Sequence, residues 1–377
     1  MENSLNIENV KRKSLELGLS QVKLAKELNV SREAVSQWFK GEKFPRPGKL
    51  LKLAQLLKLA FTEIVTGIPS PDDPVVAFRK KGGHKITDDY IDRAKDMGRM
   101  LANLVPYLPF DELTALPTLR APMMEYSYVQ RAAKRIRDRI TGRKGETITF
   151  QNLINFFGEL KAVLIPVLWG SKDAHENALH IYLPDSMTSW IYLNLDCRQH
   201  DFKFWMAHEL GHVYSPDLTG KEEGEDFADA FAGALLFPEE LAIHEYTQLR
   251  RARNMGKVIN QIKNVAVDLV VSPYTVYREI NKYAENYDKP TFDLESEREI
   301  YKANTNFHKA FKTISESLFK DEVPSPSQYV SISKLFDTPF FDVLRKYLIQ
   351  EKKSPTFLQS ILSIPFLDAQ GLYEELC

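Results

Sequence analysis

A pair of histidines four residues apart constrains this chain more than any other feature of its sequence. Residues 208–212 read His-Glu-Leu-Gly-His, inside a strongly apolar stretch that extends from residue 202 to residue 214. On a helix, residues i and i+4 lie on one face, so His208 and His212 can both reach a single ion. Burying two imidazoles and a carboxylate among apolar side chains is costly unless something compensates, and a metal ion does. The sequence therefore predicts a buried helix that carries two metal ligands.

Glu209 follows the first of these histidines and should project beside the ion rather than onto it. A carboxylate in that position can hold a water molecule activated by the metal and act as its general base in hydrolysis. Zinc is the expected ion, because it lowers the pKa of bound water from 15.7 to about 7. The alternative is that His208 and His212 are ordinary histidines of an amphipathic helix.

A catalytic zinc needs three protein ligands and an open position for water, so a third ligand is expected from another helix. Glu225 is the best candidate, because small residues share its helix face and allow a close approach to the histidine helix. Glu222 and Glu223 are weaker candidates, because we expect a break at Gly224. Asp229, one turn beyond Glu225, can orient a ligand imidazole. The alternative for this acidic run is a solvated helix N-terminus.

Residues 20–41 are typical of two helices joined by a tight turn, with Ser20 and Ser31 placed to cap the two N-termini. An apolar seam holds the helices together and leaves polar side chains exposed near the start of the second helix. Such side chains can bond to base edges in a major groove, while their neighbours contact phosphates. The alternative is a small helical bundle for protein contact. The expected DNA contacts are Gln21, Arg32, Glu33, Ser36, Gln37 and Lys40.

The charge distribution agrees with a polyanion partner for the N-terminal segment alone. Residues 1–67 contain 12 Lys and Arg against 7 Asp and Glu, a net charge of +5, whereas the whole chain has a net charge of −1. The remainder is therefore mildly acidic, so only the first segment is expected to meet nucleic acid.

The rest of the chain predicts an α+β fold that is mostly α. Residues 5–66 are expected to form a helix-turn-helix bundle of five helices, followed by a proline-rich linker at 67–74. Three runs rich in branched and aromatic residues, at 162–169, 178–183 and 189–195, predict a small antiparallel sheet. Helices are expected at 86–105, 124–140, 200–215 and 224–236, and a mostly helical pattern covers 238–377.

Two family resemblances follow from these motifs. Residues 7–67 resemble the Cro/C1-type helix-turn-helix family, whose base-reading positions correspond to Arg32, Glu33, Ser36 and Gln37. Residues from about 121 to 240 resemble the ImmA/IrrE metallo-endopeptidase domain, through WIYLN at 190–194, FWMAHELGH at 204–212, and EDFADAFA from 225 with LLFP ending at 238. The interval between the second histidine and the glutamate is shorter than is usual in that family, which requires a tight connection. The second resemblance implies zinc held by His208, His212 and Glu225, with Glu209 catalytic.

Four parts are expected from this pattern. They are a helix-turn-helix domain at 1–68, a linker and helical connector at 69–120, a zinc metallopeptidase domain at 121–290, and a helical C-terminal region of unknown role at 291–377. The resemblances imply a regulator that binds a double-stranded DNA operator and cuts a protein partner, such as a repressor. Half-site recognition by such domains usually uses two copies, so a homodimer is one arrangement to expect.

Two other functions stay open at this point. The chain could be a non-proteolytic transcription factor or antitoxin whose zinc is structural or sensory, which a fourth protein ligand would favour. It could also be a zinc hydrolase that acts on something other than protein, and only substrate screening separates that class.

The sequence also predicts the cellular compartment and the roles of two smaller features. Cys197 and Cys377 form no disulfide framework, and neither a secretory signal nor a membrane span is recognisable, so a reducing cytoplasm is expected. The segment 269–276 echoes 28–35, for which a packing role is favoured over a second DNA-reading unit. His200 is expected at the surface.

Overall fold

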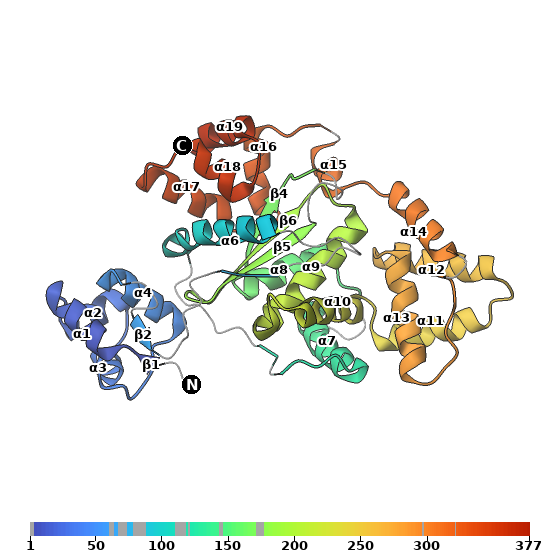
Figure 1. Ribbon diagram of the computed structural model, residues 1–377, viewed down its shortest axis with the longest axis horizontal. Coiled ribbons are helices and arrows are strands. Elements are labelled where there is room, and N and C mark those ends of the chain that lie inside the picture. The colour runs from blue at the N-terminus through green and yellow to red at the C-terminus, as the bar shows by residue number, and fades with distance from the viewer. Residues whose placement is uncertain are drawn as a thin grey trace.

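The structure, a computed structural model, describes residues 4–59, 64–66, 74–77, 88–109, 118–119, 121–142, 146–170, 177–295, 298–320 and 322–377. Figure 1 shows a small N-terminal domain beside a larger body built around a sheet. Within the described ranges, every helix is too short or too polar to cross a membrane. The predicted α+β fold with a predominance of helix is confirmed.

The N-terminal domain has its own hydrophobic core, separate from that of the body. Its two short strands pair antiparallel and bring the two ends of the domain together. Five helices were expected, and four lie within the described residues, which leave out residues 60–63. The elements are β1 Ser4–Leu5, α1 Ile7–Glu16, α2 Gln21–Leu28, α3 Arg32–Lys40, α4 Pro47–Leu57 and β2 Val65–Thr66.

The proline-rich linker also lies outside the described residues, except for Pro74. Chain that follows it enters the body directly as a strand, β3 Val75–Ala77. Pro74 packs closely on α6, where a side chain at Gly98 would place a Cβ only 2.4 Å from the Pro74 ring. Residues 75–77, which follow the linker, are therefore part of the body's sheet.

The body places a four-stranded sheet between helices. The element bounds up to the end of the histidine-bearing region are α6 Asp88–Ala102, η1 Val105–Tyr107, α7 Tyr126–Thr141, α8 Phe150–Glu159, β4 Val163–Val167, β5 Ala178–Leu183, β6 Thr188–Asn194, α9 Gln199–Tyr214, η2 Pro216–Leu218 and α10 Glu222–Leu236. The three strands and four helices predicted for this region are present, while α8 was not predicted.

The sheet is mixed, so the expected antiparallel sheet is wrong in one respect. Its order is β3-β5-β6-β4, and β4 pairs with β6 in parallel. β5 does not pair with β4, and one strand position separates the two. The short β5–β6 hairpin places β6 in that position, between β5 and β4. Every residue of β4 and β6 is buried, as is usual for parallel strands. The unbroken apolar run of residues 162–169 was already typical of a parallel strand that is buried on both faces.

Two different sets of helices cover the two faces of this sheet (Figure 1). On one face, Ile181 of β5 meets α6 at Gly98. On the other face, His180 of β5 stacks on His212 of α9, and α10 and α7 lie behind α9. Since neighbouring residues of a strand point to opposite faces, α9 and α6 sandwich β5.

The remaining chain is helical, as predicted, and it completes the body. A group of four helices follows α10, and a second group reaches the C-terminus. The bounds are α11 Glu239–Arg250, α12 Met255–Leu269, α13 Pro273–Asn286, α14 Glu299–Ala310, α15 Ile314–Phe319, α16 Pro326–Ser331, η3 Ile332–Lys334, α17 Phe340–Gln350, α18 Pro355–Leu362 and α19 Phe366–Leu376.

The C-terminal helices cover the exposed edge of the sheet. Tyr329 donates a hydrogen bond to the carbonyl of Pro166, and the Thr338 hydroxyl donates to the carbonyl of Leu164. Proline is tolerated in β4 because this strand lies at an edge, where a backbone N–H is not required. One continuous core runs from Val76 to Leu376, so the C-terminal region is integral to the body. The predicted boundaries at 120 and 290 stay predictions.

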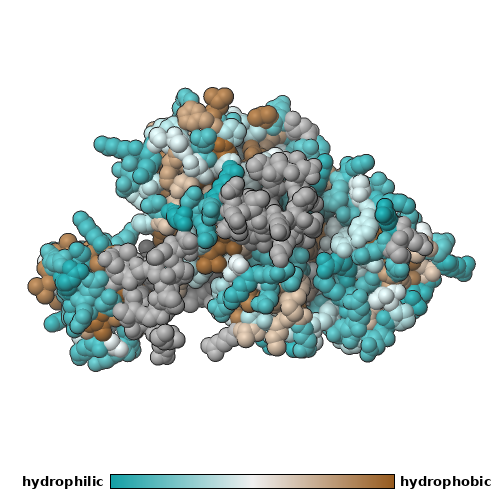
Figure 2. Space-filling model, viewed as in Figure 1, coloured by the Kyte–Doolittle hydropathy of each residue, from teal (hydrophilic) through white to brown (hydrophobic). Residues whose placement is uncertain are grey.

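The described surface of the body is mainly hydrophilic in the view of Figure 2, and brown, apolar residues are prominent on the N-terminal domain. Among the described large apolar side chains of that domain, the most exposed are Leu15, by 85%, and Val22, by 57%.

Candidate metal centre and nucleic-acid interface

Helix α9 runs through the interior of the body and holds the histidine pair. Almost every residue from Phe202 to Tyr214 is buried, as expected for a helix that is apolar on all sides. The polar side chains on it are buried as well: His208 and His212 are each 1% exposed, and Glu209 is 3% exposed. Groups with such low exposure need partners inside the protein.

The structure brings the two histidines and Glu225 together. The Nε2 atoms of His208 and His212 lie 3.1 Å apart. Each also lies 3.3 Å from a carboxylate oxygen of Glu225, Oε2 for His208 and Oε1 for His212. Three donor atoms this close can share one ion at about 2.0–2.2 Å from each. Two neutral nitrogens and one carboxylate form a donor set that suits zinc.

Close packing of α9 on α10 makes this convergence possible. A side chain at Gly211 would place a Cβ 2.9 Å from the Cα of Ala228. The connection between the helices is limited to residues 215–221 and contains η2, which agrees with the tight connection expected from the sequence. The expected break at Gly224 is wrong, because α10 already begins at Glu222. Gly224 is needed for a different reason: a Cβ there would lie 2.2 Å from the carbonyl oxygen of Leu218.

Asp229 contacts the back of the cluster, in the position anticipated for it. Its Oδ1 lies 2.9 Å from Nδ1 of His208. A carboxylate that accepts from Nδ1–H leaves the Nε2 lone pair directed at Glu225 and His212, and it holds the ring in place. Carboxylate partners of this kind are common behind metal-ligating histidines.

Several buried atoms of the cluster fit a bound cation. Among the described residues, both carboxylate oxygens of Glu225 and Oε2 of Glu209 are buried without a hydrogen-bond partner. An orphaned buried oxygen is destabilising unless an ion or a water molecule satisfies it. A divalent cation between the imidazoles, with a water molecule next to Glu209, would satisfy these atoms.

The charges of the cluster shift its pKa values strongly. Burial disfavours the charged form of His208, but contacts with Asp229 and Glu225 and the charge of Glu209 outweigh it and raise its pKa to about 10. Burial also acts against ionised Glu225, yet the two histidines lower its pKa to about 2. Burial raises the pKa of Glu209 to about 8, which the charge of His208 only partly offsets. The metal-free cluster is thus a protonated His208 held by carboxylates.

Zinc binding near neutral pH should therefore release at least one proton. His208 must be neutral to donate its lone pair, and its pKa of about 10 keeps it protonated at pH 7. The apparent affinity should rise with pH, by about tenfold per unit for one released proton, and level off near pH 10. Titration calorimetry in buffers of different ionisation enthalpy measures the released protons directly. A heat of binding that does not depend on the buffer would contradict this expectation.

A third histidine, which was not predicted from the sequence, lies beside the cluster. His180 of β5 is fully buried, and its ring stacks on His212 at 5.8 Å between centroids. Within the part of the chain that the structure describes, neither of its ring nitrogens has a hydrogen-bond partner. Burial lowers its pKa, so the ring is neutral. Only the strand register places it here, because His180 faces α9 while both of its neighbours in the strand face α6.

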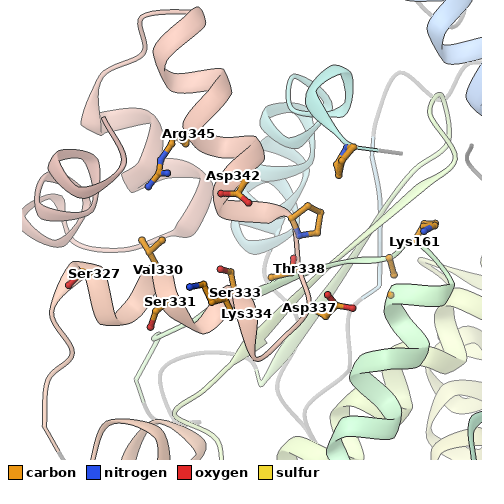
Figure 3. Close-up of a pocket in the computed structure, with 14 residues that line it drawn as sticks. Lys161, Ser327, Val330, Ser331, Ser333, Lys334, Asp337, Thr338, Asp342 and Arg345 are labelled. Atoms are coloured by element: carbon orange, nitrogen blue, oxygen red, sulfur yellow. The ribbon is translucent and has the colours of Figure 1, made fainter. Parts of the chain in front are cut away.

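Solvent reaches the cluster from the side of α10. The side chains of Glu225 and Asp229 are 12% and 23% exposed, against 2% and 1% for His208 and His212. A cavity of about 170 Å³ reaches Asp229 and Trp205, and the Trp205 ring lies 5.1 Å from that of His208. A second cavity, of about 660 Å³, is separate from the cluster: its charged lining residues in Figure 3 are Lys161, Lys334, Asp337, Asp342 and Arg345.

The helix-turn-helix geometry of the N-terminal domain is present. Ser20 and Ser31 accept from the backbone N–H groups of Lys23 and Ala34, as the predicted caps require. Asn29 turns the chain with φ of +52°, and the seam residues are buried or half-buried. The expected DNA contacts lie on this unit and are half-buried or exposed: Gln21, Arg32, Glu33, Ser36, Gln37 and Lys40.

A second unit of the same geometry occurs at the predicted echo. Val270 has φ of +52°, as Asn29 does, and Ser272 caps α13 as Ser31 caps α3. The face that would read DNA is covered, however: Tyr274 stacks on Tyr301 of α14 with ring centroids 5.8 Å apart. The motif therefore has the packing role that the sequence favoured.

Comparison with known proteins identifies two regions of the chain. Residues 10–64 match the helix-turn-helix family model, and residues 165–280 match the IrrE N-terminal-like domain model of the M78 peptidases. No curated protein and no solved structure matches the chain. Both family resemblances drawn from the sequence are confirmed, and the cluster lies inside the second matched region.

Proposed function

We propose that this chain, a helix-turn-helix domain joined to an IrrE-like metallopeptidase domain, is a DNA-binding regulator with zinc-dependent endopeptidase activity. The substrate we propose is a protein partner such as a repressor. One observation carries the enzymatic part: two imidazole nitrogens and a carboxylate converge within 3.3 Å, with Glu209 on the same helix beside them. In this proposal His208, His212 and Glu225 hold zinc.

The residues of the cluster have distinct chemical tasks in this proposal. Zinc, when bound, acts as a Lewis acid that makes water acidic enough to lose a proton near pH 7. Oε2 of Glu209 accepts that proton from the attacking water and later donates it to the amine of the leaving peptide. The raised pKa of Glu209, about 8, suits a group that both takes and returns a proton near neutrality. Asp229 keeps the His208 ring oriented throughout.

The number of ligands favours catalysis over a structural or sensory zinc. Among the described residues, the group of donor atoms around His208 has three members, and His180 is not one of them. Three protein ligands leave a position for water, whereas structural zinc is usually enclosed by four. The partly exposed side chains of Glu225 and Asp229 give a substrate a side from which to approach.

The test is a cleavage assay on the full chain. The zinc-loaded protein is incubated with a peptide library made from a bacterial proteome, and new termini are identified by mass spectrometry. We expect a defined set of peptide bonds to be cut, and a chelator to abolish the cleavage. Zinc-loaded protein that cuts no peptide or folded protein would favour the non-proteolytic regulator.

The DNA-binding part predicts a local effect of substitution on α3. An operator is first selected from random double-stranded DNA by the full chain. Arg32→Ala should then weaken operator binding by about 1–3 kcal/mol and relax the preference at one base pair, since a bidentate contact of arginine to guanine contributes about that much. Fluorescence anisotropy at fixed salt measures both effects.

Lys52→Ala provides the matched control for that experiment, because Lys52 is an exposed cation of the same domain that lies on α4. It removes the same charge without removing an expected base contact. An equal loss of affinity in both variants, with unchanged base preference, would mean that Arg32 does not read the sequence.

A further inference from the structure

A second group of metal-ligating side chains lies at the other end of α9. His200 and Asp201 belong to its first turn, and His308 lies near the end of α14. Nε2 of His200 is 2.7 Å from Nδ1 of His308. Oδ1 of Asp201 lies 3.8 Å from the first nitrogen, and Oδ2 of Asp201 lies 3.4 Å from the second. Eight residues separate His200 from His208, which is about 12 Å along a helix. The two groups are therefore distinct.

We propose that His200, Asp201 and His308 form a second binding site for a divalent transition metal ion such as zinc. Two donor atoms that share one zinc ion lie at most about 4 Å apart, because each is about 2.0–2.2 Å from it. The distance between the two nitrogens is below that limit, and so is the distance from each nitrogen to one oxygen of Asp201. Imidazole nitrogens with a carboxylate are a donor set for zinc and its neighbours rather than for magnesium or calcium.

The surroundings of His200 show that the group is built into the fold and is not a chance meeting of surface side chains. The expectation that His200 lies at the surface is wrong, since it is 0% exposed. The rings of Phe307 and Phe311 pack against it at steep angles, with centroids 5.1 and 5.3 Å away. A hydrogen bond between the two imidazoles accounts for the shortest distance alone. It does not account for a carboxylate placed within reach of both nitrogens in an apolar setting.

The support behind His308 resembles that behind His208. The side-chain amide of Asn304 lies 2.9 Å from Nε2 of His308, as Asp229 lies 2.9 Å from Nδ1 of His208. In each case a polar group fixes the ring through one nitrogen and leaves the other nitrogen facing the cluster. Nδ2 of Asn304 donates to Nε2 of His308, while Oδ1 of Asn304 accepts from the backbone N–H of Tyr274, so both ends of the amide are held in place.

An ion can reach this group from solvent. A cavity of about 600 Å³ is lined by Asp201 and His308, together with the acidic Asp196 and Glu316. Arg198 also lines it, but its guanidinium donates to the carbonyl of Phe311 and pairs with Glu316, so it faces other partners. The cavity is lined by more acidic than basic side chains, which favours a cation. Asp201 and His308 both contribute to this lining.

The bound ion would hold two distant segments together. His200 and His308 are 108 residues apart, and the chain after α14 runs along the start of α9. There, the N–H groups of Ile314 and Ser315 donate to the carbonyls of Cys197 and Leu195. An ion shared by α9 and α14 stabilises this contact, and through it the position of the helix that carries His208 and His212.

Metal stoichiometry of the full chain tests the proposal. The protein is stripped with a chelator, reloaded with zinc, separated from free ions by gel filtration and analysed by mass spectrometry for zinc per chain. We expect two equivalents in the unmodified protein, one in His308→Ala and one in Asp201→Asn. His244→Ala is the matched control, because that side chain is 62% exposed on α11 and should leave both equivalents in place.

The outcomes separate this proposal from the proposed function. His212→Ala should retain one equivalent, and combining it with His308→Ala should leave none. A single equivalent in the unmodified protein, lost in His212→Ala and unchanged in His308→Ala, overturns the second site. Two equivalents that persist in both His308→Ala and Asp201→Asn, with circular dichroism showing folded variants, overturn it as well. None of these readouts depends on peptide cleavage.

Discussion

A Glu209→Gln variant should retain its zinc and lose about 10²–10⁴-fold of its cleavage rate. Glutamine has nearly the same shape as glutamate but cannot accept a proton, and a general base contributes an acceleration of that size. Glu209 is not among the three donor atoms that converge between the helices, so the ligand set remains complete. Burial of Glu209 makes an amide easier to accommodate than a carboxylate, since burial raises the pKa of the acid to about 8. The folded state should therefore be unaffected or slightly more stable.

The measurement pairs zinc content with the initial rate of cleavage of one peptide from the library assay. Glu223→Gln is the matched control, because that glutamate is exposed in the first turn of α10, close in sequence to Glu225. It should leave both quantities unchanged. A Glu209→Gln protein that cleaves as fast as the unmodified chain would remove Glu209 from the chemistry and with it the proposed mechanism.

The parts of the site that the sequence predicted depend on local geometry. A spacing of four residues places His208 and His212 on one helix face in any helix, whatever surrounds it. The prediction of Glu225 as a ligand required one more inference, namely that small residues mark the face on which two helices approach closely. The contact of Gly211 with Ala228 shows that this step was sound. The caps at Ser20 and Ser31 are equally local, and they too were predictable.

The parts that were missed depend on contacts between distant segments. His180 lies beside His212 only because β5 occupies one position in the sheet order, and no short pattern encodes that order. His200 approaches His308 across 108 residues, so the sequence offered two separate histidines with no sign of their meeting. The parallel pairing of β4 with β6 was hidden for the same reason, although the fully apolar run of β4 was a hint.

A His212→Ala variant should lose zinc from the cluster in α9 and α10, and with it all cleavage. Losing only an outer partner of a metal ligand typically lowers affinity by about 10–100-fold, and removing one of three ligands should exceed that. Nε2 of His212 is 3.1 Å from Nε2 of His208 and 3.3 Å from Glu225, so its removal leaves two ligands and a space open to water. Operator binding should be unchanged, since the helix-turn-helix domain has its own core.

Zinc affinity is measured for this variant by competition with a chromogenic chelator, and operator binding by anisotropy on the same preparation. Because the two domains have separate cores, operator binding reports on the N-terminal domain alone, and circular dichroism of the same preparation checks that the body stays folded. His244→Ala again serves as the control for removing an imidazole from the body. If His212→Ala bound zinc at this cluster as tightly as the unmodified chain, the proposed ligand set would be wrong. The convergence of His208, His212 and Glu225 would then reflect only a buried, protonated His208 held between carboxylates, and the case for hydrolysis would end there.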